Sequence, residues 1–193
     1  MGRGALLGPL YAAAVILDPA KPIRAVDDSK KLAPARRESL AIEITEKALA
    51  FKVVSLSAAE VDALNVYEAS REAMIRAVLA LDPAPEFVLT DAMPLEGCAN
   101  TTGFLIPHRA IVHGDALSVS VAAASILAKV ARDAHLRELD RLYPQYGLAR
   151  NKGYGTRDHL AALAAYGPCP EHRKSYQPVK DYLLPLFPFA GVP

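Results

Sequence analysis

Short apolar runs of strand length alternate with helical patterns along this chain, and that alternation restricts its fold more than any other feature. Residues 10–17, 51–56, 87–90 and 109–113 are apolar or β-branched runs that predict strands. Apolar residues at helical spacing predict helices over residues 34–50, 57–64, 67–81, 118–142 and 157–165. Strands that alternate with helices predict an α/β fold.

The chain has 193 residues, of which 52% are hydrophobic and 22% charged, so it can bury a sizeable core and is not disordered. We expect one domain over residues 1–180 and an apolar, proline-rich tail without regular structure over residues 181–193. No apolar run is long enough to cross a bilayer. Two cysteines without metal-site spacing fit a reduced, cytoplasmic protein, which we expect to be a monomer.

Two aspartates follow apolar strands. Asp91 comes after residues 87–90, and Asp115 comes after residues 109–113 and just before the longest predicted helix. The carboxyl ends of strands form the edge of an α/β sheet where sites are usually built. Carboxylates without His or Cys favour Mg²⁺ or Mn²⁺ over zinc. The alternative is that each is an ordinary turn aspartate.

Two further groups are candidate substrate contacts. Ser125 and Lys129 lie four positions apart on the long helix, so they share a face that suits phosphates. Tyr154 stands between glycines, where its ring offers a flat surface to a sugar or base. A solvent-facing lysine, a core serine and a tyrosine that fills part of the core are the alternatives. The net charge of +1 does not by itself argue for a nucleic-acid partner.

Several short motifs add to these candidates when their order and spacing are considered together. They are Gly2-Arg3-Gly4, Gly8-Pro9, Asp28-Ser29-Lys30-Lys31-Leu32, Thr90-Asp91, Gly114-Asp115, Ala122-Ala123-Ala124-Ser125-Ile126-Leu127-Ala128-Lys129-Val130, Arg132-Asp133, Lys152-Gly153-Tyr154-Gly155-Thr156 and Gly167-Pro168-Cys169-Pro170-Glu171-His172-Arg173-Lys174-Ser175. This set resembles ribonuclease HII over residues 2 to about 179. The motif of the long helix and the Lys-Gly-Tyr-Gly turn are its most specific parts.

The resemblance implies an RNase H-like fold, a mixed sheet flanked by helices. It also implies a metal-dependent endonuclease that cleaves the RNA strand of RNA/DNA hybrids, incises 5′ to single ribonucleotides in duplex DNA, and leaves 5′-phosphate ends. Mg²⁺ or Mn²⁺ in a two-metal site is the implied cofactor. The implied roles are metal binding by Asp91 and Asp115, recognition of the 2′-hydroxyl by Gly2, Arg3 and Gly4, packing of Tyr154 on the sugar, and phosphate contacts by Ser29, Lys30, Ser125 and Lys129.

The N-terminus departs from the family pattern. In the family, Asp-Glu and one further residue precede the Gly-Arg-Gly loop on the first strand, which is central in the sheet; here that further residue is Met1. We therefore expect the sheet to lack this strand and the site to lack two carboxylates. Four carboxylates balance two divalent cations, whereas two do not, so we expect little activity from this chain. We also expect a longer natural product in which a GUG codon at position 1 was taken as the start.

Two other functions remain as alternatives. A catalytically inert protein could still bind hybrid duplexes through its basic residues and Tyr154. Ribonuclease HIII is disfavoured, because that family carries an additional N-terminal domain for which we expect no room in this chain.

Overall fold

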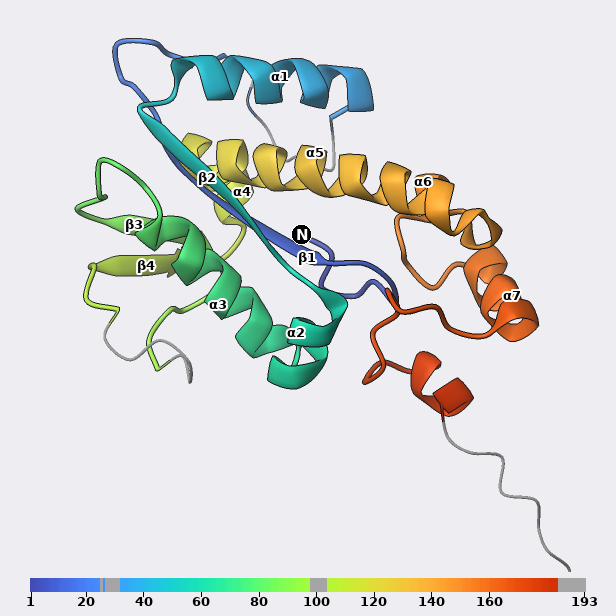
Figure 1. Cartoon of the computed structure of the whole chain (residues 1–193). Helices are drawn as coiled ribbons and strands as arrows, with labels where there is room; N and C mark the ends of the chain where they lie inside the picture. The colour runs from blue at the N-terminus through green and yellow to red at the C-terminus, as the bar shows by residue number, and fades with distance from the viewer. Residues whose placement is uncertain (25, 27–31, 98–103, 184–193) are drawn as a thin grey trace, which may run out of the picture.

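The computed structural model describes residues 1–24, 26, 32–97 and 104–183 (Figure 1). Two predicted phosphate-binding residues, Ser29 and Lys30, lie outside the described residues, as does the tail from residue 184. Among the described helices, none combines the length and the hydrophobicity that a bilayer crossing needs.

The described strands form two separate pairs. β1 (Leu10–Ile16) and β2 (Ala50–Leu56) are antiparallel and pair along their whole length. β3 (Val88–Asp91) and β4 (His108–Ile111) are parallel. All four predicted strands therefore form, with ends shifted by one or two residues.

The helices begin close to their predicted positions. α2 has the predicted capping box: the Glu60 N–H donates to the Ser57 hydroxyl, and the Ser57 N–H donates to the Glu60 carboxylate. Four short helices of the described residues, α4, η1, α6 and η2, were not predicted, because one or two turns leave no periodic pattern. The helices are α1 (Pro34–Lys47), α2 (Ala58–Leu64), α3 (Val66–Leu79), α4 (Gly114–Leu117), α5 (Val119–Leu142), α6 (Leu148–Asn151) and α7 (Arg157–Tyr166), with the 3₁₀ helices η1 (Pro144–Tyr146) and η2 (Val179–Leu183).

Helices cover both faces of β1, which explains its nearly continuous apolar sequence. Side chains alternate between the faces of a strand. Ala12 and Ala14 belong to the apolar clusters built with α3, whereas Ala13 and Val15 pack in the cluster built from α1 and α5. Figure 1 shows α1 and α5 on one side of the β1–β2 pair and α3 on the other.

A cavity of about 950 Å³ lies between β1 and β3. Residues 11–17, which include most of β1, and all of β3 line it. Met74 and Val78 of α3 and Val121 and Ala124 of α5 add to its walls. Within the described residues, the strands thus form two separate pairs, and the cavity lies between β1 of one pair and β3 of the other.

The tail is more ordered at its start than predicted. Residues 181–183 belong to η2, whose turns are closed by hydrogen bonds from the Lys180 N–H to the Tyr176 carbonyl and from the Asp181 N–H to the Pro178 carbonyl. Val179 is fully buried in a cluster with Leu6, which anchors η2 to the rest of the molecule. The expectation of irregular structure from residue 181 is therefore wrong for its first three residues.

Candidate active site

Asp91 and Asp115, the two predicted metal-binding carboxylates, line the same cavity. Asp91 is the last residue of β3, and its Oδ1 accepts a hydrogen bond of 3.0 Å from the Gly114 N–H. A Cβ on residue 114 would lie 3.3 Å from both the Asp91 Cα and the Thr90 carbonyl oxygen, so a glycine allows this close approach. Asp115 follows immediately. The structure brings the two residues together, and their metal binding stays a prediction.

The sequence suggested that Asp115 directly precedes the long helix, but the structure places it elsewhere. It belongs to α4, a single turn that begins after His113, whose φ is 59°. Ser118 separates this turn from α5 and is the N-cap of α5, its hydroxyl accepting from the Val121 N–H. The N-terminus of the long helix is therefore at Ser118 and not at Asp115.

The Gly2-Arg3-Gly4 loop and Tyr154 line the cavity with the two aspartates. Gly2 has a φ of +83°, and a Cβ there would lie 2.2 Å from Arg132 Nε, so only glycine fits. A Cβ on Gly4 would lie 3.9 Å from Tyr154 Cε1, which places the loop beside the ring. Tyr154 is 41% exposed, so the ring is accessible to a ligand.

The turn that carries Tyr154 is bonded to the chain that follows the Gly2-Arg3-Gly4 loop. The Gly153 carbonyl accepts hydrogen bonds from the Leu6 N–H at 2.8 Å and the Leu7 N–H at 3.3 Å. Lys152 and Gly153 both have positive φ, of 54° and 76°. Burial lowers the pKa of the Lys152 ammonium. The turn and the loop are therefore one connected unit.

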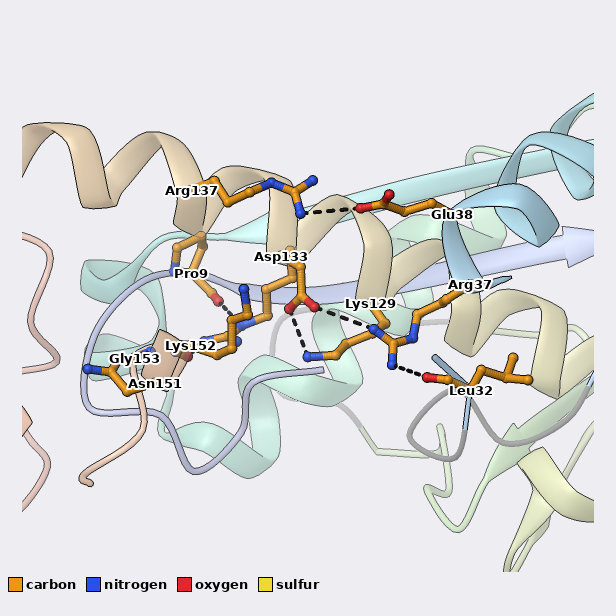
Figure 2. Close-up of polar contacts among 11 residues, drawn as sticks. Pro9, Leu32, Arg37, Glu38, Lys129, Asp133, Arg137, Asn151, Lys152 and Gly153 are labelled. Atoms are coloured by element: carbon orange, nitrogen blue, oxygen red, sulfur yellow. Dashed lines mark hydrogen bonds and ion pairs between the residues drawn. The ribbon is translucent and has the colours of Figure 1, made fainter. Parts of the chain in front are cut away.

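Ser125 and Lys129 differ in their surroundings although they lie one turn apart on α5. Ser125 lines the cavity, whereas Lys129 is not among the lining residues. Lys129 Nζ lies 2.7 Å from Asp133 Oδ1, and Arg37 Nη1 lies 3.6 Å from Asp133 Oδ2, as Figure 2 shows. Arg37 also donates to the Leu32 carbonyl. Asp133 therefore holds two cations, and a phosphate contact by Lys129 stays a prediction.

Two buried arginines behind the loop were quoted in the sequence motifs but given no role. Arg132 and Arg173 are 1% and 0% exposed and bind main-chain carbonyl groups of the loop, of the chain that follows it and of the turn. Figure 2 shows the bond to the Pro9 carbonyl. The available signal was an arginine among the apolar residues of α5, but a sequence pattern does not tell a buried arginine from an exposed one.

A buried chain of hydrogen bonds supports Tyr154 from its carbonyl group. The Cys169 N–H donates to His172 Nδ1 at 3.0 Å, so the proton of His172 lies on Nε2. His172 Nε2 is 3.3 Å from His159 Nε2, and His159 Nδ1 is 2.9 Å from the Tyr154 carbonyl oxygen. Burial lowers the pKa of His159, and burial together with the neighbouring His159 lowers that of His172 to about 4. Both imidazoles are therefore neutral at pH 7.

The described residues supply only part of a divalent-cation site. Asp91 and Asp115 offer the oxygen donors that Mg²⁺ and Mn²⁺ prefer. In the part of the chain that the structure describes, no group of three or more His, Cys, Asp or Glu side chains is placed to hold a metal ion. The donor chemistry fits, but these two aspartates leave a cation with few protein ligands.

Comparisons with known proteins agree with the sequence motifs. A sequence model of the family described as Ribonuclease HII matches residues 1–179. The ribonuclease HII of Solibacter usitatus (strain Ellin6076) is 48% identical over 200 residues, which cover 99% of this chain and 85% of the relative. That of Geobacillus thermodenitrificans (strain NG80-2) is 52% identical over 182 residues, covering 94% of this chain and 68% of the relative.

The fold agrees as well. The crystal structure of the ribonuclease H2 from Pyrococcus horikoshii OT3 matches with a TM-score of 0.77 at 24% identity, over 94% of this chain and 93% of that chain. This likeness confirms the predicted RNase H-like α/β fold. Both of these sequence relatives are ribonucleases HII, the family that the motifs indicated. With Asp91, Asp115, Tyr154 and the Gly2-Arg3-Gly4 loop around one cavity and about half of its sequence shared with these enzymes, the chain belongs to the ribonuclease HII family.

Proposed function

We propose that this protein is a metal-dependent endonuclease that cleaves the RNA strand of RNA/DNA hybrids and incises 5′ to single ribonucleotides in duplex DNA. One observation carries the proposal: Asp91, Asp115, the Gly2-Arg3-Gly4 loop and Tyr154 line a single cavity. One substrate in this cavity can then reach two carboxylates that can bind a metal ion, a backbone that can approach a ligand closely, and a ring that can pack on a sugar.

The loop and the ring are the part of the site that distinguishes RNA from DNA. Only a ribonucleotide has a 2′-hydroxyl, which can both donate and accept a hydrogen bond. The main chain of Gly2, Arg3 and Gly4 offers partners for that group, and Tyr154 packs on the same sugar. Ser125, Lys129 and, outside the described residues, Ser29 and Lys30 contact the phosphates in this proposal.

Asp91 and Asp115 hold the divalent cation, Mg²⁺ or Mn²⁺. A bound cation would supply positive charge that activates water and stabilises the leaving oxygen. Two carboxylates carry a charge of −2 against +4 for two such ions. We therefore expect the 193-residue chain to bind its substrate and to cleave it slowly.

The test uses the purified 193-residue chain and three duplexes of one sequence: all DNA, DNA with one ribonucleotide, and an RNA/DNA hybrid. Binding is followed by fluorescence anisotropy and cleavage by gel electrophoresis, with Mn²⁺, with Mg²⁺ or with EDTA. We expect tighter binding of the two ribonucleotide-containing duplexes. We also expect slow, EDTA-sensitive cleavage that leaves a 5′-phosphate.

The outcomes separate the proposal from its alternative. Equal affinity for all three duplexes contradicts recognition of the ribonucleotide. Selective binding with no cleavage under any metal condition favours the alternative, an inert hybrid-duplex-binding protein. Cleavage that persists in EDTA contradicts the metal dependence.

A further inference from the structure

Arg132 and Arg173 carry positive charge into the protein interior without an ion pair. All their hydrogen bonds within the described residues go to uncharged oxygens: main-chain carbonyls and the Tyr176 hydroxyl. Taking a guanidinium out of water is costly when no carboxylate compensates it. Burial lowers the pKa of both arginines, which reflects this cost. The energetic cost of burying these two guanidinium groups must therefore be offset by a gain in stability or in function.

Arg173 fixes the direction of the peptide group between Arg3 and Gly4. Its Nη1 donates to the Arg3 carbonyl at 2.9 Å, and the Tyr176 hydroxyl donates to the same oxygen at 2.7 Å. Its Nε and Nη2 both donate to the Gly8 carbonyl, at 3.1 and 2.9 Å. One rigid guanidinium thus holds the loop at Arg3 and the chain that follows the loop at Gly8.

The direction of that peptide group determines what the loop presents. In a planar trans peptide the C=O and the following N–H point in opposite directions. Because the Arg3 carbonyl points inward to Arg173, the Gly4 N–H points away from the interior. Gly4 is exposed and lines the cavity. The loop therefore offers an N–H donor at the cavity.

Arg132 packs against Gly2 of the loop, where a Cβ would lie 2.2 Å from its Nε. Its Nε donates to the Pro9 carbonyl at 3.2 Å and its Nη2 to the Lys152 carbonyl at 3.0 Å, which ties the chain that follows the loop to the turn that carries Tyr154. Its guanidinium also lies over the Tyr154 ring, 5.6 Å from the ring centre. This places a cation against the face of the ring.

We propose that Arg173, with Tyr176, and Arg132 are positioning residues for recognition of the ribonucleotide. They hold the Gly4 N–H and the Tyr154 ring at a fixed separation that admits a ribose and its 2′-hydroxyl. The inference rests on the proposed function. In this proposal the exposed loop and ring contact the ribonucleotide, and buried residues that touch no substrate make that contact selective.

The experiment compares the affinity for a duplex with one ribonucleotide with that for the all-DNA duplex. In Arg173→Gln and Arg132→Gln we expect the ratio of these affinities to fall by about tenfold, the effect of about one lost hydrogen bond to the sugar, while the affinity for all-DNA duplex stays unchanged. Arg173→Lys, which keeps the charge without the fork, should restore only part of the ratio.

A second variant and a control keep the test decisive. Tyr176→Phe removes one donor to the Arg3 carbonyl but leaves the buried charge, so it should fold even where Arg173→Gln does not, and should lower the ratio less. Arg71→Gln is the matched control, because Arg71 is another buried arginine, 6% exposed, and is not among the residues that line the cavity. It should lower the thermal midpoint and leave the ratio unchanged.

The results separate this inference from the proposed function. If the wild-type chain does not prefer the ribonucleotide duplex, the proposed function fails. The second case is that the wild-type chain prefers the ribonucleotide duplex. If Tyr176→Phe and those arginine variants that fold then retain the full affinity ratio, the arginines only stabilise the fold and this inference is overturned. Hydrogen exchange at the Gly4 amide gives a second readout, which should change in Tyr176→Phe and not in Arg71→Gln.

Discussion

At Gly153 the absence of a side chain allows the Tyr154 turn to pack against the chain that leads into β1. A Cβ on residue 153 would lie 2.3 Å from the Leu7 carbonyl oxygen, closer than atoms can approach. Gly153→Ala should therefore lower the free energy of unfolding by about 3 kcal/mol or more, since backbone strain adds to the clash. Urea unfolding followed by circular dichroism measures the change.

Gly147→Ala is the matched control for this prediction. Gly147 also has a positive φ, of 63°, but the nearest atoms to a Cβ there are 3.6 Å away. It should cost about 1–2 kcal/mol, which is the backbone term alone. Equal losses in the two variants would show that the contact with Leu7 is unimportant.

At Lys129 the structure weakens an expectation drawn from sequence spacing. A lysine that contacts one phosphate contributes about 0.9 to the slope of log affinity against log salt concentration. Lys129 is already paired with Asp133 at 2.7 Å, so a phosphate must compete with that carboxylate. We expect Lys129→Ala to flatten the slope by well under about one unit, measured by anisotropy over a range of salt concentrations.

Asp133→Asn provides the opposite change. It removes the carboxylate that pairs with Lys129 at 2.7 Å, so the Lys129 ammonium becomes available to a phosphate and the salt dependence should steepen. A full unit of flattening in Lys129→Ala would instead establish a direct phosphate contact.

Among the elements, β1 presents one of its edges to the cavity. Met1 and Tyr11 exchange two backbone hydrogen bonds, so the main-chain groups of Tyr11 point away from β2. These groups alternate in direction along a strand. The N–H and C=O groups of Ala13 and Val15 therefore also point away from β2, and both residues line the cavity.

β3 presents an edge to the same cavity. The Val88 N–H donates to the carbonyl of Pro107, just before β4, and the Ala92 N–H donates to the carbonyl of Ile111 in β4. By the same alternation, the main-chain groups of Leu89 and Asp91 point away from β4, and both residues line the cavity. One residue of a strand in a packed sheet occupies about 160 Å³, from spacings of about 3.3, 4.8 and 10 Å. The cavity of about 950 Å³ therefore has room for a short strand between these two edges.

Residues added before Met1 test this interpretation of the cavity. Six residues of alternating valine and alanine should continue the pairing of Met1 with Tyr11 along β1. Each new hydrogen bond contributes about 1 kcal/mol, and each 1 kcal/mol raises the melting temperature of a chain of this size by about 2–4 °C. Calorimetry should show a clear increase.

The control extension has the same length with proline at alternate positions. Proline has no N–H and cannot complete a ladder of hydrogen bonds. The melting temperature should then stay unchanged. An equal rise with both extensions would mean that the cavity does not bind a strand.

For the whole molecule, the buried histidine pair makes stability depend on pH. The folded protein holds His172 with a pKa of about 4, whereas the ordinary value is 6.5. The unfolded chain therefore binds a proton that the folded protein excludes, and the contribution of His172 is complete above about pH 6.5. It is lost as the pH falls from there towards 4, by about 3 kcal/mol in total. The lowered pKa of His159 acts in the same direction.

We expect the free energy of unfolding to fall between about pH 6.5 and 4, as measured by urea unfolding at each pH. His172→Asn should flatten this dependence because it removes the titrating group. His113→Asn is the control, since His113 is exposed and its positive φ of 59° suits asparagine. A steep fall that persists in His172→Asn would assign the pH dependence to other groups.

Much of the fold was predictable because it follows from local pattern. The continuous apolar run of β1, the capping box at Ser57 and the long uninterrupted pattern of α5 are each set by neighbours a few residues apart. The same holds for the placement of Asp91 at the end of a strand. Single-turn helices such as α4 were not predicted, because a turn of four residues has no periodicity to detect.

The sequence by itself determined the α/β class and the family, and it singled out Asp91, Asp115, Tyr154 and the Gly2-Arg3-Gly4 loop, which line one cavity. Tertiary structure alone decided that Arg132 and Arg173 are buried, that Lys129 forms an ion pair with Asp133, and that a cavity lies between the two strand pairs. The physical reason is the range of the contacts. Arg173 binds carbonyls of Arg3 and Gly8, at sequence separations of 170 and 165, and no local pattern records which distant groups will replace water around a charge.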